Sequence, residues 1–178
     1  MRICIFYSSP KLGDIILQLP FIKAISVHFN KKVTLCINQN INIQNILQKQ
    51  NYIDSVIVNP FRRGRFFLND VFKLSKILKQ KNIDCAFILE KTKGTAIACK
   101  LAKVDKIFGF GIGSQKFLVE NFSRLKKNDL RYNYTYQSIK FLNFHKISYN
   151  FNDKFLILDQ IEKINFKKKY ESLPKPWV

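Results

Sequence analysis

The chain has 178 residues, 47% of them hydrophobic and 14% aromatic, and its 31 basic and 12 acidic residues give a formal net charge of +19. This apolar content can fill the core of one ordinary domain, and it excludes an intrinsically disordered chain. The charge attracts anions such as nucleic acids, acidic lipid headgroups or phosphorylated sugars. However, 25 of the 31 basic residues are lysines spread along the chain, which indicates a compositional bias rather than a nucleic-acid groove.

Short apolar runs alternate with helical segments along the whole chain. The runs have the length and composition of buried strands, and they lie at residues 2–7, 33–37, 55–58, 84–89 and around 106–110. The helical segments lie at residues 15–29, 41–50, 69–80, 95–102, 132–144 and 159–170. Because strands alternate with helices, the sequence predicts an α/β fold with a largely parallel sheet.

Local signals refine this assignment. The first helix is apolar nearly all round, so we expect it to be buried, with a kink at Pro20. Asn69 is expected to be the N-cap of the third helix. Residues 111–131 are polar and predict irregular structure. Residues 1–170 are therefore assigned to one domain, and the proline-containing residues 171–178 to a linker and the start of a further domain.

The cysteines and histidines do not predict a metal site or a disulfide framework. Cys4, Cys36, Cys85 and Cys99 lie in apolar runs, without a C-x-x-C pair or a histidine at ligand spacing, and are expected to be reduced core residues. The two histidines, His28 and His145, fall near helix ends and are expected to have capping or surface roles.

The N-terminus lacks the features of a secretory signal, and no apolar stretch is long enough to span a bilayer. We therefore expect a cytoplasmic location, which still permits peripheral contact with a membrane surface.

Asp14 is the strongest candidate for a functional residue. It follows a glycine in the tight loop between the first strand and the first helix, where an α/β sheet presents reactive groups to a ligand. A carboxylate at this place can act as a general base. The alternative is an N-cap, because Asp is a preferred capping residue and stabilises a helix by roughly 1 kcal/mol.

A second candidate is the loop FRRGRFF at residues 61–67, which follows the third strand. It places Arg62, Arg63 and Arg65 among aromatic residues, and planar guanidinium groups bind phosphates and carboxylates well. The alternatives are a solvated surface loop and a nonspecific membrane contact.

Three stretches resemble one known family. They are LGDIILQLP at residues 12–20, YIDSVIV at 52–58 and TAIACKLA at 95–102 followed by KIFG at 106–109. In order and spacing they are similar to the N-terminal half of the ADP-heptose:lipopolysaccharide heptosyltransferases and related glycosyltransferases of family 9. The resemblance implies a GT-B fold, in which two Rossmann-like domains face each other across a cleft. In that family the N-terminal domain binds the acceptor and the C-terminal domain binds the nucleotide-sugar donor.

The resemblance also implies roles for individual residues. Asp14 would be the general base of a metal-independent inverting displacement from an ADP-heptose-like donor, with no further cofactor. Lys11 and Gly13 would contact substrate beside it, and the loop arginines would bind a phosphorylated glycolipid or glycan acceptor, such as the lipopolysaccharide core, at the cytoplasmic face of the inner membrane.

This chain also departs from the family pattern. LEKTKG at residues 89–94 replaces the usual Asp-x-Gln-Gly stretch, so Lys91 and Lys93 are expected to supply the positive charge there. The stretch GFGIG at residues 109–113 lacks the spacing of the dinucleotide fingerprint and is expected to be a flexible strand exit. A noncatalytic acceptor-binding module is the alternative function. A nucleic-acid binder rests on charge alone and ranks below both.

Overall fold

The computed structural model describes residues 1–9, 11–38, 43–61, 68–120, 124–150, 155–157, 164 and 168. Five parallel strands form one sheet in the order β3-β2-β1-β4-β5. The strands are β1 (Ile3–Tyr7), β2 (Val33–Asn38), β3 (Ile53–Asn59), β4 (Cys85–Ile88) and β5 (Lys106–Gly109). The predicted parallel sheet is therefore confirmed.

The middle of the sheet is buried on both faces. Every residue of β1, β2 and β4 is buried, as expected for parallel strands that helices cover on both sides. The first strand lies between its neighbours, so that Ile5 pairs with Leu35 on β2 and with Phe87 on β4. This register aligns the carboxyl ends of the strands along one edge of the sheet.

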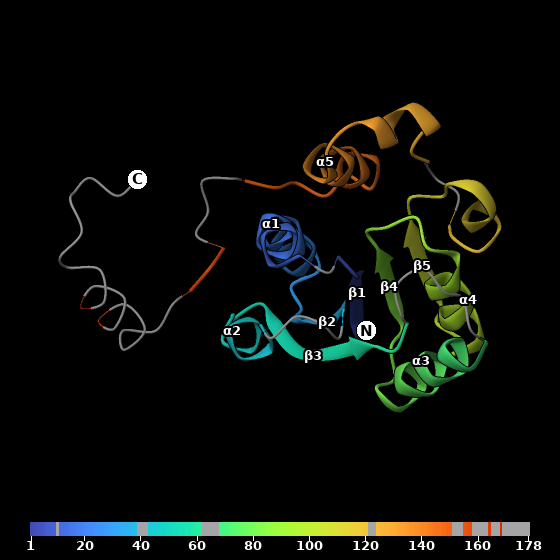
Figure 1. Cartoon of the computed structure of the whole chain (residues 1–178), viewed down its shortest axis with the longest axis horizontal. Helices are drawn as coiled ribbons and strands as arrows, with labels where there is room; N and C mark the ends of the chain where they lie inside the picture. The colour runs from blue at the N-terminus through green and yellow to red at the C-terminus, as the bar shows by residue number, and fades with distance from the viewer. Residues whose placement is uncertain are drawn as a thin grey trace.

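Helices cover both faces of the sheet (Figure 1). They are α1 (Leu12–His28), α2 (Gln44–Gln48), α3 (Leu68–Gln80), α4 (Lys93–Leu101) and α5 (Tyr134–Phe144), with short 3₁₀ helices η1 (Gly113–Phe117) and η2 (Lys127–Arg131). One core lies beneath α1, α2 and α5, and the other lies beneath α3 and α4. Side chains alternate between these cores along β1, because Ile5 points into the first and Phe6 into the second.

Several boundaries differ from the sequence prediction. The first helix begins at Leu12, three residues earlier than expected, and continues through Pro20 to His28. The third helix begins at Leu68, so Asn69 lies inside it and the predicted N-cap is wrong. The second helix is shorter than expected, and the segment expected to be irregular contains η1 and η2. These differences arise where capping and tertiary contacts, rather than periodicity, set the ends.

The expectation that the first helix is buried holds for only part of its surface. Ile15, Leu19 and Ile22 are buried, but Leu17 is 60% exposed and Val27 is 65% exposed. The reason is geometric, since a helix that packs on one face of a sheet leaves its opposite side in solvent whatever residues it carries there. None of the helices within the described ranges is long and apolar enough to cross a bilayer.

The predicted helix at residues 159–170 falls almost entirely outside the described residues, of which it includes only Ile164 and Lys168. Residues 171–178 also lie outside them. That helix and the domain boundary at residue 170 therefore stay predictions.

The cysteines are core residues, as the sequence predicts. All four, Cys4, Cys36, Cys85 and Cys99, are unpaired and no more than 1% exposed, and burial raises the pKa of each thiol. Because the thiolate is the reactive form, we expect Ellman's reagent to label none of these thiols in the folded chain and all of them in guanidinium chloride. Rapid labelling under native conditions would contradict this packing.

Candidate active site at the carboxyl edge of the sheet

The candidate site lies where the strand order changes direction. The chain passes from β1 to β2 on one side and later to β4 on the other, and such a switch point leaves a crevice beyond the carboxyl ends of the two central strands. A cavity of about 490 Å³ opens at this place. Its lining residues are Tyr7, Ser8, Ser9, Glu90, Lys91, Thr92, Phe110, Leu130, Tyr132, Asn133, Tyr134 and Gln137.

Asp14 lies in the first turn of α1 and is hydrogen-bonded to a residue that lines this cavity. The hydroxyl of Ser9, which lines the cavity, donates to Asp14 Oδ2 at 2.5 Å. Asp14 is half-buried and is not itself among the lining residues. A carboxylate in the first helical turn also interacts favourably with the helix dipole. The alternative N-cap role is wrong, because Lys11 occupies the N-cap position and Asp14 is the third helical residue.

Lys11 and Gly13 precede Asp14 in the chain and are both exposed. A Cβ atom added at Gly13 would meet nothing within 4 Å, so packing within the described residues gives no reason for glycine there. Glycine in a helix costs roughly 0.5–1 kcal/mol relative to alanine. The position therefore keeps open space beside the start of α1, where a ligand can approach the backbone.

The carboxylate of Glu90 accepts several hydrogen bonds at the wall of the cavity. They come from the Ser8 backbone N–H at 3.1 Å, the Ser8 hydroxyl at 3.2 Å and the Thr92 hydroxyl at 2.9 Å. Glu90 as a whole is half-buried, yet these groups enclose its carboxylate. Burial raises the pKa of Glu90, and the hydrogen bonds from Thr92 and Ser8 offset part of that rise. Glu90 thus joins the end of β4 to the loop that leads to Asp14.

Sequence reasoning did not identify Glu90 as a site residue. The available signal was its position directly after a buried strand of a parallel sheet, with hydroxyl residues Thr92 and Thr95 closely following. The resemblance to family 9 drew attention instead to the lysines that surround it.

The raised pKa makes a prediction about stability. Between the ordinary pKa of 4.5 and the higher folded value, the folded chain holds a proton that the unfolded chain has released, so this group's stabilising contribution is lost as pH rises. Glutamine does not titrate. We expect the free energy of unfolding of Glu90→Gln, relative to wild type, to become more favourable from about pH 4 to about pH 8. Urea unfolding at both pH values measures this, with Glu120→Gln as the control, and a difference that does not change with pH would contradict it.

Buried amides from β3 and η1 support the floor of the cavity. Asn59 Nδ2 at the end of β3 donates to Ser8 Oγ at 2.7 Å. Gln115 Nε2 in η1 donates to the carbonyl oxygens of Glu90 at 2.9 Å and Thr92 at 3.0 Å, while its Oε1 accepts from the Gly111 N–H at 2.8 Å. Asn59 is 1% exposed and Gln115 is fully buried. Buried polar groups that are fully paired in this way hold one geometry.

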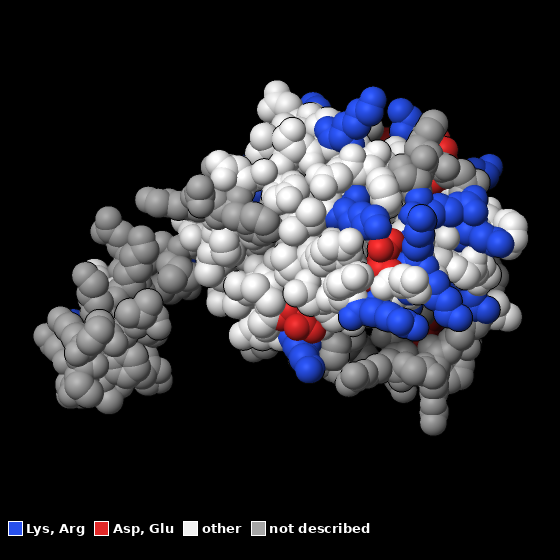
Figure 2. Space-filling view, turned by 90° about the horizontal axis from the view of Figure 1, so that it is seen from above, with Lys and Arg blue, Asp and Glu red and all other residues white. Residues whose placement is uncertain are grey.

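The structure brings only some of the predicted cations to the cavity. Lys91 is exposed and lines it, whereas Lys93 begins α4 and is not a lining residue. Arg62, Arg63 and Arg65 lie outside the described residues, so their role stays a prediction. Figure 2 shows Lys and Arg side chains gathered over the side of the molecule that holds α4 and β5 in Figure 1, next to a broad uncharged area.

Two further predictions have mixed outcomes. His28 is exposed at the end of α1, as expected. His145 occupies the C-cap position of α5, but its ring is half-buried against Phe108 and Phe141, at 4.9 and 4.6 Å between centroids, so a surface role is wrong. Burial lowers the pKa of His145.

The glycine stretch at residues 109–113 forms the exit of β5. Gly111 has φ of +67°, which favours glycine, and a Cβ atom there would lie 2.8 Å from Arg124 Cγ. A Cβ atom at Gly109 would lie 2.9 Å from Val119 Cγ1. Both glycines therefore lie where the chain is closely packed. The flexibility expected for this stretch stays a prediction.

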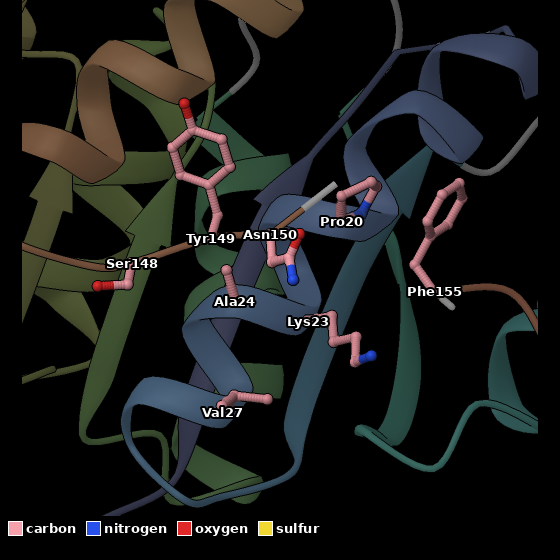
Figure 3. Close-up of a pocket in the computed structure, with 8 residues that line it drawn as sticks. All are labelled: Pro20, Lys23, Ala24, Val27, Ser148, Tyr149, Asn150 and Phe155. Atoms are coloured by element: carbon pink, nitrogen blue, oxygen red, sulfur yellow. The ribbon is translucent and has the colours of Figure 1, made fainter. Parts of the chain in front are cut away.

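A second pocket, of about 240 Å³, lies on the outer side of α1 (Figure 3). Its walls are Pro20, Lys23, Ala24 and Val27 of that helix, and Ser148, Tyr149, Asn150 and Phe155. These α1 residues occupy its later turns, away from Asp14, and none of the lining residues is a carboxylate. No cluster of three or more His, Cys, Asp or Glu that could hold a metal occurs in the described parts of the chain.

Comparison with known proteins identifies structural relatives. The fold is similar to that of the family 9 glycosyl transferase from Veillonella parvula DSM 2008, with a TM-score of 0.71 and 17% identity over 96% of this chain and 49% of that one. E. coli ADP-heptose lps heptosyltransferase II gives a TM-score of 0.66 and 14% identity over 98% and 52% of the two chains. E. coli heptosyltransferase WaaC with ADP gives a TM-score of 0.60 and 15% identity over 86% of this chain and 50% of that one.

The chain spans about half the length of each of these proteins. No protein-family model matches the sequence, and a comparison with curated proteins finds no significant match. At such low identities the likeness shows the fold, and it confirms the predicted fold class. The chain has the Rossmann-like fold of the N-terminal half of a family 9 glycosyltransferase.

Proposed function

We propose that this chain is the acceptor-binding half of a heptosyltransferase-like enzyme. The complete enzyme transfers a sugar from a nucleotide-sugar donor to the lipopolysaccharide core or another surface glycan. The observation that carries the proposal is the position of Asp14, which is joined through Ser9 to the cavity at the switch point. Its support is a fold shared with family 9 transferases.

In the proposed reaction Asp14 is the general base. A sugar hydroxyl is a poor nucleophile, and a carboxylate within hydrogen-bond reach takes its proton as its oxygen attacks the anomeric carbon of the donor. The new carbon–oxygen bond forms as the bond to the nucleoside diphosphate breaks on the opposite face, so the configuration inverts and the proton stays on Asp14. Ser9 donates to Oδ2, and we assign the other oxygen, Oδ1, to the acceptor hydroxyl.

The surrounding residues have complementary roles in this proposal. Gly13 leaves space for the substrate beside the helix N-terminus, and Lys11 is exposed in the same loop. Lys91 lines the cavity, and together with Lys93 and the three loop arginines it would attract the phosphates of a glycolipid acceptor. The charged side of Figure 2 supports an anionic partner. We infer peripheral contact with the cytoplasmic face of the inner membrane.

The test is sugar transfer by a reconstituted cleft. The 178-residue chain is joined to the half of the Veillonella parvula protein that it does not match, and the product is supplied with radiolabelled ADP-heptose and lipopolysaccharide-core acceptors. We expect labelled acceptor to accumulate. Acceptor binding without any transfer, in a cleft shown to bind ADP-heptose, would instead indicate the alternative function, a noncatalytic acceptor-binding module.

A further inference from the structure

Two exposed tyrosines line the mouth of the cavity, and a third lies beside them. Tyr132 is 58% exposed, Tyr134 is 54% exposed and Tyr136 is 39% exposed. The first two line the cavity. Large aromatic side chains in solvent beside a cavity that offers a few polar groups are typical of a binding site rather than of the core.

These tyrosines are held in place before any ligand arrives. The rings of Tyr132 and Tyr136 lie 4.5 Å apart, and Tyr134 meets Tyr7 edge-on at 6.1 Å. The side chain of Asn133 caps α5 by accepting from the Tyr136 N–H at 2.8 Å, and Gln137 Nε2 donates to the Tyr132 carbonyl at 2.8 Å. Rings fixed in this way lose little conformational entropy on binding.

The second turn of α5 anchors the helix to the rest of the domain. Ser138 Oγ donates to Gln18 Oε1 of α1 at 2.7 Å, with both residues buried. Lys140 Nζ contacts Asp129 Oδ1 of η2 at 2.7 Å. The tyrosines therefore keep a fixed position relative to the loop that carries Asp14.

Tyr7 gives an independent sign of a ligand. Its side chain lines the cavity and is only 2% exposed, and its buried hydroxyl makes no hydrogen bond to any part of the chain that the structure describes. A buried unpaired hydroxyl costs about 1–3 kcal/mol. Burial raises the pKa of Tyr7 and the nearby Asp14 carboxylate raises it further, while a contact with the Ser9 hydroxyl that falls short of hydrogen-bond geometry offsets part of the rise. The hydroxyl therefore stays protonated and needs an acceptor.

The rest of the lining favours an uncharged polyhydroxy ligand. It offers the hydroxyls of Ser8, Ser9 and Thr92, the amides of Asn133 and Gln137, and the enclosed carboxyl group of Glu90. Lys91 is the one cation among the lining residues that the structure describes. A phosphate site usually gathers several cations or backbone N–H groups. Here a single lysine stands beside aromatic rings and neutral polar groups.

We propose that this cavity binds an uncharged pyranose ring, stacked on Tyr134 and Tyr132 and hydrogen-bonded at its edge by Tyr7 and Glu90. The weakly positive C–H groups of such a ring lie against the negative face of an aromatic ring, while its hydroxyls pair with the cavity wall. The inference rests on the proposed function for the identity of this ring as part of the acceptor. Because the part of the lining that the structure describes holds a single cation, the inference also implies that any phosphate on the acceptor lies outside the cavity.

The experiment measures sugar binding by the 178-residue chain without any donor. Methyl α-D-mannopyranoside and methyl β-D-glucopyranoside are titrated by NMR, with tyrosine ring protons as the readout. We expect at least one glycoside to bind and to shift the signals of Tyr132 and Tyr134. Tyr134→Ala should weaken binding about five- to tenfold, and Tyr134→Phe, which keeps the ring, should stay within about twofold. Phe117→Ala, an exposed ring on η1 outside the cavity, is the matched control and should bind as wild type.

Tyr7→Phe gives a second, sharper test. Removing an unpaired buried hydroxyl should leave the unfolding midpoint unchanged or raise it, whereas loss of the hydrogen bond to the sugar should weaken binding about threefold or more. A merely structural role for this hydroxyl would lower the midpoint instead. Opposite effects on stability and binding are therefore the expected signature.

Three results would overturn the inference. They are no binding of either glycoside, wild-type affinity in Tyr134→Ala, and displacement of the glycoside by an equal concentration of inorganic phosphate. These outcomes are separate from the fate of the proposed function. If transfer depends on Asp14 but glycoside affinity is the same with and without the tyrosine rings, the transferase proposal stands and the stacking site fails. If glycoside binding depends on the tyrosines but the reconstituted cleft never transfers sugar, the stacking site stands and the transferase proposal fails.

Discussion

Asp14→Asn should lower the turnover of the reconstituted transferase by about 10²- to 10⁴-fold, the usual contribution of a general base. Asparagine has nearly the same shape and can still accept the hydrogen bond that Ser9 donates to Asp14 Oδ2. It cannot take a proton from the acceptor hydroxyl. The change therefore removes the proton acceptor while it preserves the geometry of the loop.

The measurement separates kcat from KM. We expect the loss in kcat, with KM for the acceptor changed less than about threefold, because the base acts mainly in the transition state. Ser9→Ala should give a smaller loss, since it removes the group that orients the carboxylate. Asp105→Asn is the control, because this exposed residue directly precedes β5 at the amino end of the sheet, opposite the cavity. Unchanged turnover in Asp14→Asn would remove Asp14 from the mechanism.

Phe141→Ala should reduce the free energy of unfolding by about 3–5 kcal/mol, the range for truncating a buried phenylalanine. Phe141 is 1% exposed, and its ring lies 5.6 Å from that of Phe110 and 6.3 Å from that of Phe87. These contacts attach α5 to the sheet. Truncation leaves a cavity that the neighbouring rings can fill only in part.

Chemical denaturation at constant pH measures this loss, and Phe117→Ala is the matched control. Phe117 is 77% exposed, so its truncation should change the unfolding free energy by less than about 0.5 kcal/mol. Because α5 carries Tyr134 and Tyr136, and the Tyr136 ring lies against that of Tyr132, Phe141→Ala should also weaken glycoside binding well below its unfolding transition. A loss under about 1 kcal/mol would show that α5 contributes little to the core.

The sheet and its ligand edge could be predicted from the sequence because both depend on local patterns. Buried parallel strands are continuous apolar runs, and residues directly after them must reach the carboxyl edge. This reasoning identified Asp14 after β1 and predicted the α/β class, whereas Lys91 came from the resemblance to family 9. The start of α1 was placed too late because Leu12 and Gly13 give no capping signal.

The far wall of the cavity could not be predicted in the same way. Tyr134 reaches the cavity because α5 packs against α1, through contacts such as the one between Ser138 and Gln18, which are 120 residues apart. The hydrophobic periodicity of α5 does not predict which distant helix it packs against. Glu90 was missed for a related reason, since its importance comes from Ser8, which lies 82 residues earlier. Pairings over such separations form only in the folded chain.

The amides that support the floor of the cavity divide the site into two parts with different tolerance to change. Beneath the crevice the Asn59 amide donates to Ser8 and the Gln115 amide donates to the Glu90 carbonyl, so these hydrogen bonds connect the ends of several strands. A substitution at one of these residues therefore disturbs several neighbours. In the opening turn of α5, Gln137 is buried and donates to the Tyr132 carbonyl, whereas Tyr134 is exposed at the rim. Replacing Tyr134 alone by another aromatic or a charged residue should therefore redirect the choice of ligand without rebuilding the scaffold, which makes it the natural starting point for engineering.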